Sequence, residues 1–379
     1  MDFTFSDEQQ AALEAAQTVF ARIAPDQVPS PALTTGAVAD DIDRALWKRL
    51  ADADLLSLLL DPEHGGAGLD PIALCLVLRE SAKVLARVPL LENTAAAGAL
   101  QAYGSPELKA DILARAGRGE QILTVAAHGR TGHDPAELAV VARQDTDGTW
   151  VLDGIHTAVP WAYNADAVLL PAHTDDSGRT VLALVPRLHT GVVLAEQFST
   201  TGERLAELRL ESARLAPRYM IDTEQAWEWL RLLLTTGTCA LALGLGEAVL
   251  AMTSAYTGKR EQFGHPVATF QAVAVQAADR YIDLRAVEAT LWQAAWRISS
   301  GAAGALPASA DVAVAKIWAS EGVRRVVQTA QHLHGGFGAD TDYPLHRYHA
   351  WAKHLELSLG PAAAHEETLG DLLAAHPLG

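Results

Sequence analysis

The stretch His332-Leu333-His334-Gly335-Gly336-Phe337-Gly338, followed by Tyr343-Pro344, lies near the C-terminal end of the 379-residue chain and decides the predicted fold. Helical spacing of apolar residues runs from Ala308 to about Leu333, and the paired glycines then end this helix, because glycine readily adopts helix-terminating conformations. A new helical pattern starts near Leu345. The stretch therefore predicts a turn between two helices, with glycines that would let backbone amides approach an anion.

Two more long helices are predicted before this turn. One runs from the capping sequence Asp222-Thr223-Glu224-Gln225 to about Tyr256, and the other from Thr269 to Ser299, ahead of Ser300-Gly301. Four long helices with short connections predict a four-helix bundle, which we assign to residues 221–379. The small-residue run Gly237 to Gly246 is expected to allow close helix packing, as at a subunit interface.

The rest of the chain divides into a helical and a β-rich part. Residues 1–122 are predicted to form an N-terminal helical domain, beginning with the capping box Ser6-Asp7-Glu8-Gln9. Between 123 and 220, short β-rich runs predict a small, mostly antiparallel β-domain. Asp153-Gly154 is a hairpin signal there, and Asp147-Gly148 and Ser177-Gly178 indicate further turns. The expected fold class is α+β in three parts.

Composition excludes several classes of protein. Lys and Arg number 29 against 46 Asp and Glu, so the net charge of −17 argues against nucleic acid or an anionic membrane as a partner. The two cysteines, Cys75 and Cys239, cannot form a disulfide framework, which is typical of a cytoplasmic protein. The histidines lack other ligands at familiar spacings, so no metal site is predicted. The longest uncharged helical run, Leu232 to Gly246, is too short to span a bilayer.

Two motifs in the predicted bundle carry a family resemblance. The first is Arg260-Glu261-Gln262-Phe263-Gly264 followed by Phe270-Gln271, and the second is His334-Gly335-Gly336-Phe337-Gly338 followed by Tyr343-Pro344. They resemble the R-x-x-F-G…F-Q and H-G-G-x-G…Y-P elements of the acyl-CoA dehydrogenase family, and the resemblance covers nearly the whole chain. It implies α,β-dehydrogenation of an acyl-CoA thioester, with the hydride passing to FAD.

The resemblance also implies how the two motifs act, because in the family they reach across a subunit interface to a neighbour's FAD. The residues that this chain would lend to a partner's FAD are Arg260, Phe263, Gln271, His332, Gly335 and Gly336. Arg260 suits this role, since its planar fork of donors matches a pyrophosphate. The alternative is a surface cation paired with Glu261, beside glycines that only end a helix.

The positions of the family's catalytic base are occupied by leucine. Most members use a Glu that falls here at Leu359, and a subset uses one that falls at Leu234. An aliphatic side chain cannot remove the α-proton. Glu356 and Glu228 are the nearest carboxylates that could substitute, although each is more readily interpreted as an ion-paired helix residue. No catalytic residue is therefore predicted in this chain.

The family's contacts to a protomer's own flavin are also largely missing. The flavin loop falls at 128–134, where only Gly132 and Asp134 match. A tryptophan and a hydroxyl residue of the family are replaced by Ala158 and Pro160, and a phosphate-binding threonine by Pro361. His332 stands where the family has glutamine. The chain thus retains the residues that would contact a partner's FAD and lacks most of those that would bind a flavin of its own.

This pattern resembles the base-lacking subunit of heteromeric acyl-CoA dehydrogenases, including the steroid side-chain type. We therefore expect a heterotetramer with a catalytic acyl-CoA dehydrogenase subunit, an FAD shared with that partner, and the acyl-CoA substrate bound on the partner. Two alternatives stay open: a stand-alone flavin-dependent monooxygenase of the same fold, and a structural or regulatory relative without flavin.

Overall fold

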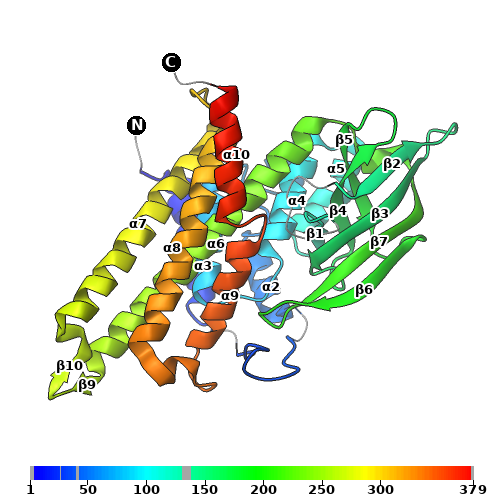
Figure 1. Ribbon diagram of the computed structural model, residues 1–379. Coiled ribbons are helices and arrows are strands. Elements are labelled where there is room, and N and C mark those ends of the chain that lie inside the picture. The colour runs from blue at the N-terminus through cyan, green and yellow to red at the C-terminus, as the bar shows by residue number, and fades with distance from the viewer. Residues whose placement is uncertain (1–3, 26, 40–41, 130–137, 377–379) are drawn as a thin grey trace.

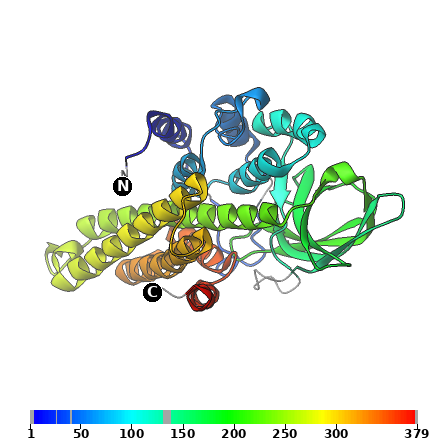
Figure 2. The same ribbon diagram turned by 90° about the horizontal axis from the view of Figure 1, so that it is seen from above.

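The computed structural model describes residues 4–25, 27–39, 42–129 and 138–376, and it has three parts in chain order (Figure 1). Helices come first, a sheet follows, and a bundle of long helices ends the chain. The predicted fold class is confirmed. In the view from above, the sheet curves round at one end of the bundle and the N-terminal helices cover one side (Figure 2).

The N-terminal part consists of short helices around an apolar core. They are α1 (Asp7–Phe20), α2 (Arg44–Asp52), the 3-10 turn η1 (Pro62–His64), α3 (Pro71–Lys83), α4 (Leu90–Tyr103) and α5 (Pro106–Gly117). The predicted capping box is confirmed, because the backbone N–H of Gln9 donates to Ser6 Oγ and that of Ser6 donates to Gln9 Oε1. Helix α4 is apolar on every side and almost wholly buried, so it carries no amphipathic pattern.

The middle part is one mixed sheet whose pairs are mostly antiparallel. Its strands are β1 (Leu123–Val125), β2 (Val140–Gln144), β3 (Trp150–Pro160), β4 (Ala167–Thr174), β5 (Thr180–Pro186), β6 (Val192–Phe198), β7 (Arg204–Leu215) and β8 (Met220–Ile221). The order is β6-β7-β3-β2-β4-β5-β8, with β1 also paired to β4. Strands β1 and β2 run parallel to β4, and the long β3–β7 pair is antiparallel.

The hairpin predicted at Asp153-Gly154 is wrong, because both residues lie inside β3. Gly154 sits at a shift in the β3–β7 register with φ 145°, and a Cβ there would lie 2.2 Å from the carbonyl oxygen of Ala139. The glycine therefore permits a bulge and a close approach of β2, not a turn. The turns expected at Gly148 and Gly178 are observed, both with positive φ.

The bundle contains α6 (Glu224–Lys259), α7 (Gln271–Ser300), α8 (Ala308–His334), α9 (Leu345–Leu357) and α10 (Ala362–Ala375). The predicted fourth helix is thus divided. Leu359 and Gly360 between α9 and α10 have φ values of 56° and 96°, which no α-helix accommodates. This break lies beside the bundle's contact with the sheet and shapes the inner site.

Helix α6 is the central element, and it differs from expectation in two ways. By length and composition it could cross a membrane, yet 78% of its most apolar 18-residue window is buried inside the protein, as in a core helix. Its small residues pack within the chain and not at a subunit interface. A Cβ on Gly244 would lie 1.9 Å from the carbonyl oxygen of Arg79 in α3, and one on Gly237 would lie 2.4 Å from Leu91 of α4.

Candidate functional site

The structure brings the two bundle motifs together at one end of the bundle. Tyr256, near the end of α6, stacks on His334 at the end of α8 with ring centroids 4.3 Å apart, and on Phe337 at 5.5 Å. The Nε2 atom of His334 lies 3.0 Å from the hydroxyl of Tyr343. The segments that follow, the α6–α7 tip and the α8–α9 turn, therefore lie side by side (Figure 1).

The α6–α7 tip is a small hairpin that presents an aromatic ring to solvent. Strands β9 (Glu261–Gln262) and β10 (His265–Pro266) are joined by Phe263 and Gly264, whose φ values of 54° and 78° are those of a type I′ turn. The ring of Phe263 is 90% exposed and contacts Phe270 edge-on at 6.4 Å. A large apolar residue in a strained, exposed position is typical of a contact surface.

Arg260 and two glycines of the α8–α9 turn, Gly335 and Gly336, are also exposed to solvent. Arg260 is exposed and its side chain has no ion pair among the residues that the structure describes, so the pairing with Glu261 considered above does not form. Gly335 has φ 60°, and neither it nor Gly336 has an atom within 4 Å of an added Cβ. We call the exposed residues Arg260, Phe263, Gln271, His332, Gly335 and Gly336 the exposed edge.

A second site lies inside the chain, where the bundle, the sheet and the N-terminal helices meet. It is a cavity of about 410 Å³, and both base positions, Leu234 of α6 and Leu359 of the α9–α10 break, line it. Two residues 125 positions apart in sequence thus converge on one space. Neither can accept a proton.

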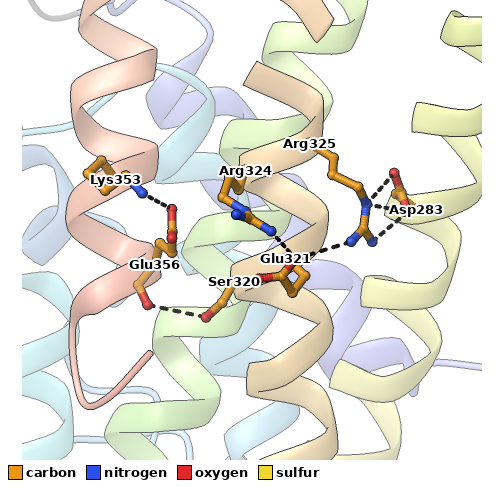
Figure 3. Close-up of polar contacts among 7 residues, drawn as sticks. All are labelled: Asp283, Ser320, Glu321, Arg324, Arg325, Lys353 and Glu356. Carbon is orange, nitrogen blue, oxygen red and sulfur yellow. Dashed lines mark hydrogen bonds and ion pairs between the residues drawn. The ribbon is translucent and has the colours of Figure 1, made fainter. Parts of the chain in front are cut away.

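The two substitute carboxylates lie outside this cavity. Glu356 of α9 receives a hydrogen bond from Lys353 Nζ at 2.6 Å, and its backbone oxygen accepts one from Ser320 at 3.2 Å (Figure 3). Because α9 ends at Leu357, Glu356 is not on one helical face with Leu359, as an unbroken helix would require. Glu228 is paired with Arg231 at 2.8 Å on the exposed side of α6.

One wall of the cavity contains the positions where the family contacts a protomer's own flavin, and its backbone is hydrogen-bonded within the chain. Ala158 and Pro160, at the end of β3, both line the cavity. The N–H of Ala158 donates to Gln197 Oε1 at 2.8 Å, and the carbonyl of Pro160 accepts from the hydroxyl of Thr124 at 2.7 Å. The N–H of Ala158 is therefore already used within the chain, and Pro160 has no N–H to offer a flavin. Residues 130–134 of the flavin loop lie outside the described part of the chain.

Sequence reasoning missed one polar side chain of the cavity, Glu92. It lies in the first turn of α4 and lines the space with Glu203, which accepts a hydrogen bond from Thr201 at 3.0 Å. Burial raises the pKa of Glu92 to about 7, and the Glu203 carboxylate adds to this, while a hydrogen bond from Trp161 opposes it. No motif surrounds Glu92, so no local signal could have found it.

The chain is similar in sequence and fold to known proteins over most of its length. The family model of the acyl-CoA dehydrogenase N-terminal domain matches residues 6–120, and that of the C-terminal domain matches residues 234–373. Acyl-CoA dehydrogenase FadE27 of Mycobacterium tuberculosis (strain ATCC 25618 / H37Rv) is 39% identical over 88% of this chain and 89% of its own. A chain of the ChsE4-ChsE5 complex from Mycobacterium tuberculosis superposes with a TM-score of 0.89 at 36% identity, covering 100% of both chains. A chain of the Tcur3481-Tcur3483 steroid ACAD gives 0.86 at 35%, covering 97% and 98%.

The chain belongs to the acyl-CoA dehydrogenase family. Acyl-CoA dehydrogenases are a family of flavoprotein oxidoreductases.

Proposed function

We propose that this chain is the non-catalytic subunit of a heteromeric acyl-CoA dehydrogenase and that it completes the FAD site of a catalytic partner. One observation carries the proposal. The N–H of Ala158 and the carbonyl of Pro160 are hydrogen-bonded within the chain, whereas the Arg260 side chain is exposed and has no ion pair among the residues that the structure describes. The backbone groups of the inner wall are thus bonded within the chain, whereas the guanidinium of Arg260 is available to a partner.

The exposed edge fits the pyrophosphate end of FAD. Arg260 would bind the phosphates through its planar fork, and the backbone around Gly335 and Gly336 would leave room for the anion to approach. Phe263 and Gln271 would pack against the remainder of the same cofactor. FAD, when bound, supplies the acceptor for a hydride. The α-proton must go to a base on the partner, because Leu234 and Leu359 cannot take it.

The relatives support a partner of the same fold. The ChsE4-ChsE5 complex and the Tcur3481-Tcur3483 steroid ACAD are both named as assemblies of two different chains. We propose an analogous pair, assembled as a heterotetramer, with a bulky acyl-CoA such as a steroid side-chain thioester on the partner. The monooxygenase alternative needs a flavin site in this chain, and the closed wall at Ala158 and Pro160 counts against it.

The test is to replace Arg260 and measure FAD binding by the assembled pair. Arg260→Ala should weaken FAD binding about tenfold to a hundredfold, because a hydrogen bond to a charged group contributes roughly 1.5–3 kcal/mol. Arg260→Lys should restore only part of this, since a point charge lacks the bidentate fork. The matched control is Arg118→Ala, an exposed arginine paired with Glu120 in the N-terminal part. Equal FAD affinity for the Arg260→Ala and wild-type pairs would disprove the role.

A further inference from the structure

The inner cavity has the size and lining of a ligand-binding site, although the proposed function assigns it no ligand. Its volume of about 410 Å³ lies within the range of small-molecule sites. The lining is mostly apolar and comes from all three parts of the chain, including Leu78, Leu91, Val125, Leu205, Leu241 and Leu359. A space of this kind inside a folded chain favours an apolar occupant over water.

A few polar groups face this apolar space from different elements. Glu92 of α4 and Trp161 both line the cavity, and burial raises the pKa of the Glu92 carboxyl group to about 7, so part of it is protonated near neutral pH. The indole N–H of Trp351, on α9, is buried and has no hydrogen-bond partner within the described part of the chain. Protonated Glu92 and the indole N–H of Trp351 can each donate a hydrogen bond to an oxygen atom of a ligand, and both residues line the same cavity.

The charges around the cavity select against ions. Glu203 of the β6–β7 loop lines the cavity and would repel an anion, whereas Lys353 of α9 lines the same space and would repel a cation. His128 also lines it, and burial lowers the pKa of this histidine to about 4, so it is uncharged near neutral pH. An uncharged ligand meets neither penalty.

We propose that this cavity binds a neutral, largely apolar small molecule whose carbonyl or hydroxyl oxygen meets Glu92. The site belongs to this chain itself and is separate from the exposed edge that would contact a partner's flavin. The inference stands independently of that flavin role, because it rests on the lining, the volume and the polar groups of the cavity alone.

The first test uses Nile red, a neutral apolar dye with a carbonyl group, titrated into the purified full-length chain. One saturable site with blue-shifted emission is expected. Leu241→Trp fills the cavity from α6 and should weaken dye binding at least about tenfold, the loss of roughly 1.4 kcal/mol. Leu188→Trp, at a position 83% exposed on the surface, is the matched control and should bind as wild type. Equal affinity in the Leu241→Trp and wild-type chains would overturn the proposal.

The second test identifies the polar anchor without changing the shape of the cavity. Ionisation of Glu92 places a charge against the apolar dye, so wild-type affinity should fall by up to about tenfold between pH 6 and pH 8, as its protonated fraction falls. Glu92→Gln should remove this pH dependence, and Glu228→Gln, outside the cavity, should keep it. A pH dependence that survives in Glu92→Gln would assign it to Glu203, Lys353 or His354 and disprove the role of Glu92.

A competition experiment separates this site from a flavin site. Excess FAD should leave the dye bound. Displacement of the dye by FAD would overturn the inference, since the cavity would then be the chain's own flavin site. The Arg260→Ala measurement on the assembled pair decides the proposed function separately, because it follows FAD at the exposed edge and does not depend on the dye.

Discussion

At the scale of single residues, the proposed function depends on two leucines. Leu234 and Leu359 reach the same cavity from α6 and from the α9–α10 break, where a carboxylate would have to stand. Replacing one leucine changes only the base, because the hydrogen bonds that close the wall at Ala158 and Pro160 remain.

Leu359→Glu should therefore not create dehydrogenation by this chain alone. A positioned base is worth about 10²–10⁴-fold in rate, but no hydride acceptor is held beside it. The measurement is reduction of an artificial electron acceptor with acyl-CoA, using the wild-type chain and Leu359→Gln as controls for fold and side-chain size. Acyl-CoA turnover by the Leu359→Glu chain would show that the inner wall does accept a flavin.

At the scale of elements, the contact between α3 and α6 depends on a missing side chain. Gly244 lies against the carbonyl oxygen of Arg79, and the guanidinium of Arg79 in turn binds Glu247 one turn along α6, with Nε 2.8 Å from Oε2. The two helices are therefore both close and fixed in register.

Gly244→Ala should destabilise the protein by several kcal/mol, because the new methyl group overlaps backbone atoms of α3 that cannot move independently. Gly258→Ala, in the same helix with no atom within 4 Å of its Cβ, is the matched control and should stabilise by up to about 1 kcal/mol. Urea unfolding of both variants provides the comparison. Equal stability of the two would mean that α3 and α6 can separate without cost.

The end of α9 is held by a buried amine of α8. Lys316 is 1% exposed and donates hydrogen bonds to the carbonyl oxygens of Leu355 at 2.9 Å and Glu356 at 3.1 Å. A cation at a helix C-terminus is favourable, because the last carbonyls carry partial negative charge. Leu359 enters the cavity four residues after the first of these carbonyls, so Lys316 positions the wall of the site.

Burial lowers the pKa of Lys316 to about 8 from the ordinary 10.5. The stability of the protein therefore depends on pH through this lysine. Between these values the unfolded chain binds more protons than the folded one, so this lysine makes stability rise with pH from about 8 to 10.5. Lys316→Met should remove that rise and cost roughly 1–3 kcal/mol near pH 7, because two buried carbonyls lose their donor.

The measurement is urea unfolding of wild type and Lys316→Met at pH 7.5 and 9.5. The stability difference between them should be larger at pH 9.5. Lys353→Met, at a half-exposed lysine on α9, is the matched control for the loss of a lysine side chain. A difference that shrinks with rising pH would contradict the lowered pKa of Lys316.

At the scale of the whole molecule, α6 links two sites with opposite properties. It places Leu234 in the lining of the inner cavity and Arg260 at the exposed edge, at the far end of the bundle from the sheet (Figure 1). The proposed function, as one half of an assembly, uses this difference between a hydrogen-bonded inner wall and an exposed edge.

Expressed alone, the protein should accordingly be nearly colourless. Co-expressed with a base-bearing relative of the same family, the pair should be yellow, with about one FAD for each two chains, because only the partner offers a complete inner site. Absorbance near 450 nm against protein concentration measures the ratio. A stoichiometric flavin in the solitary chain would contradict both this prediction and the assignment of Ala158 and Pro160 as blocking residues.

The sequence by itself determined the order of the three parts, the capping box at Ser6, the helix end at Gly301 and the leucines at both predicted base positions, since each depends on a few neighbouring residues or on a motif. Only the tertiary structure decided that Gly154 forms a bulge, that Tyr256 stacks on His334, and that Leu234, Leu359 and Glu92 share one cavity. Such features arise where distant segments exclude water from one another. A raised carboxyl pKa such as that of Glu92 depends on this exclusion, and no stretch of the chain encodes it alone.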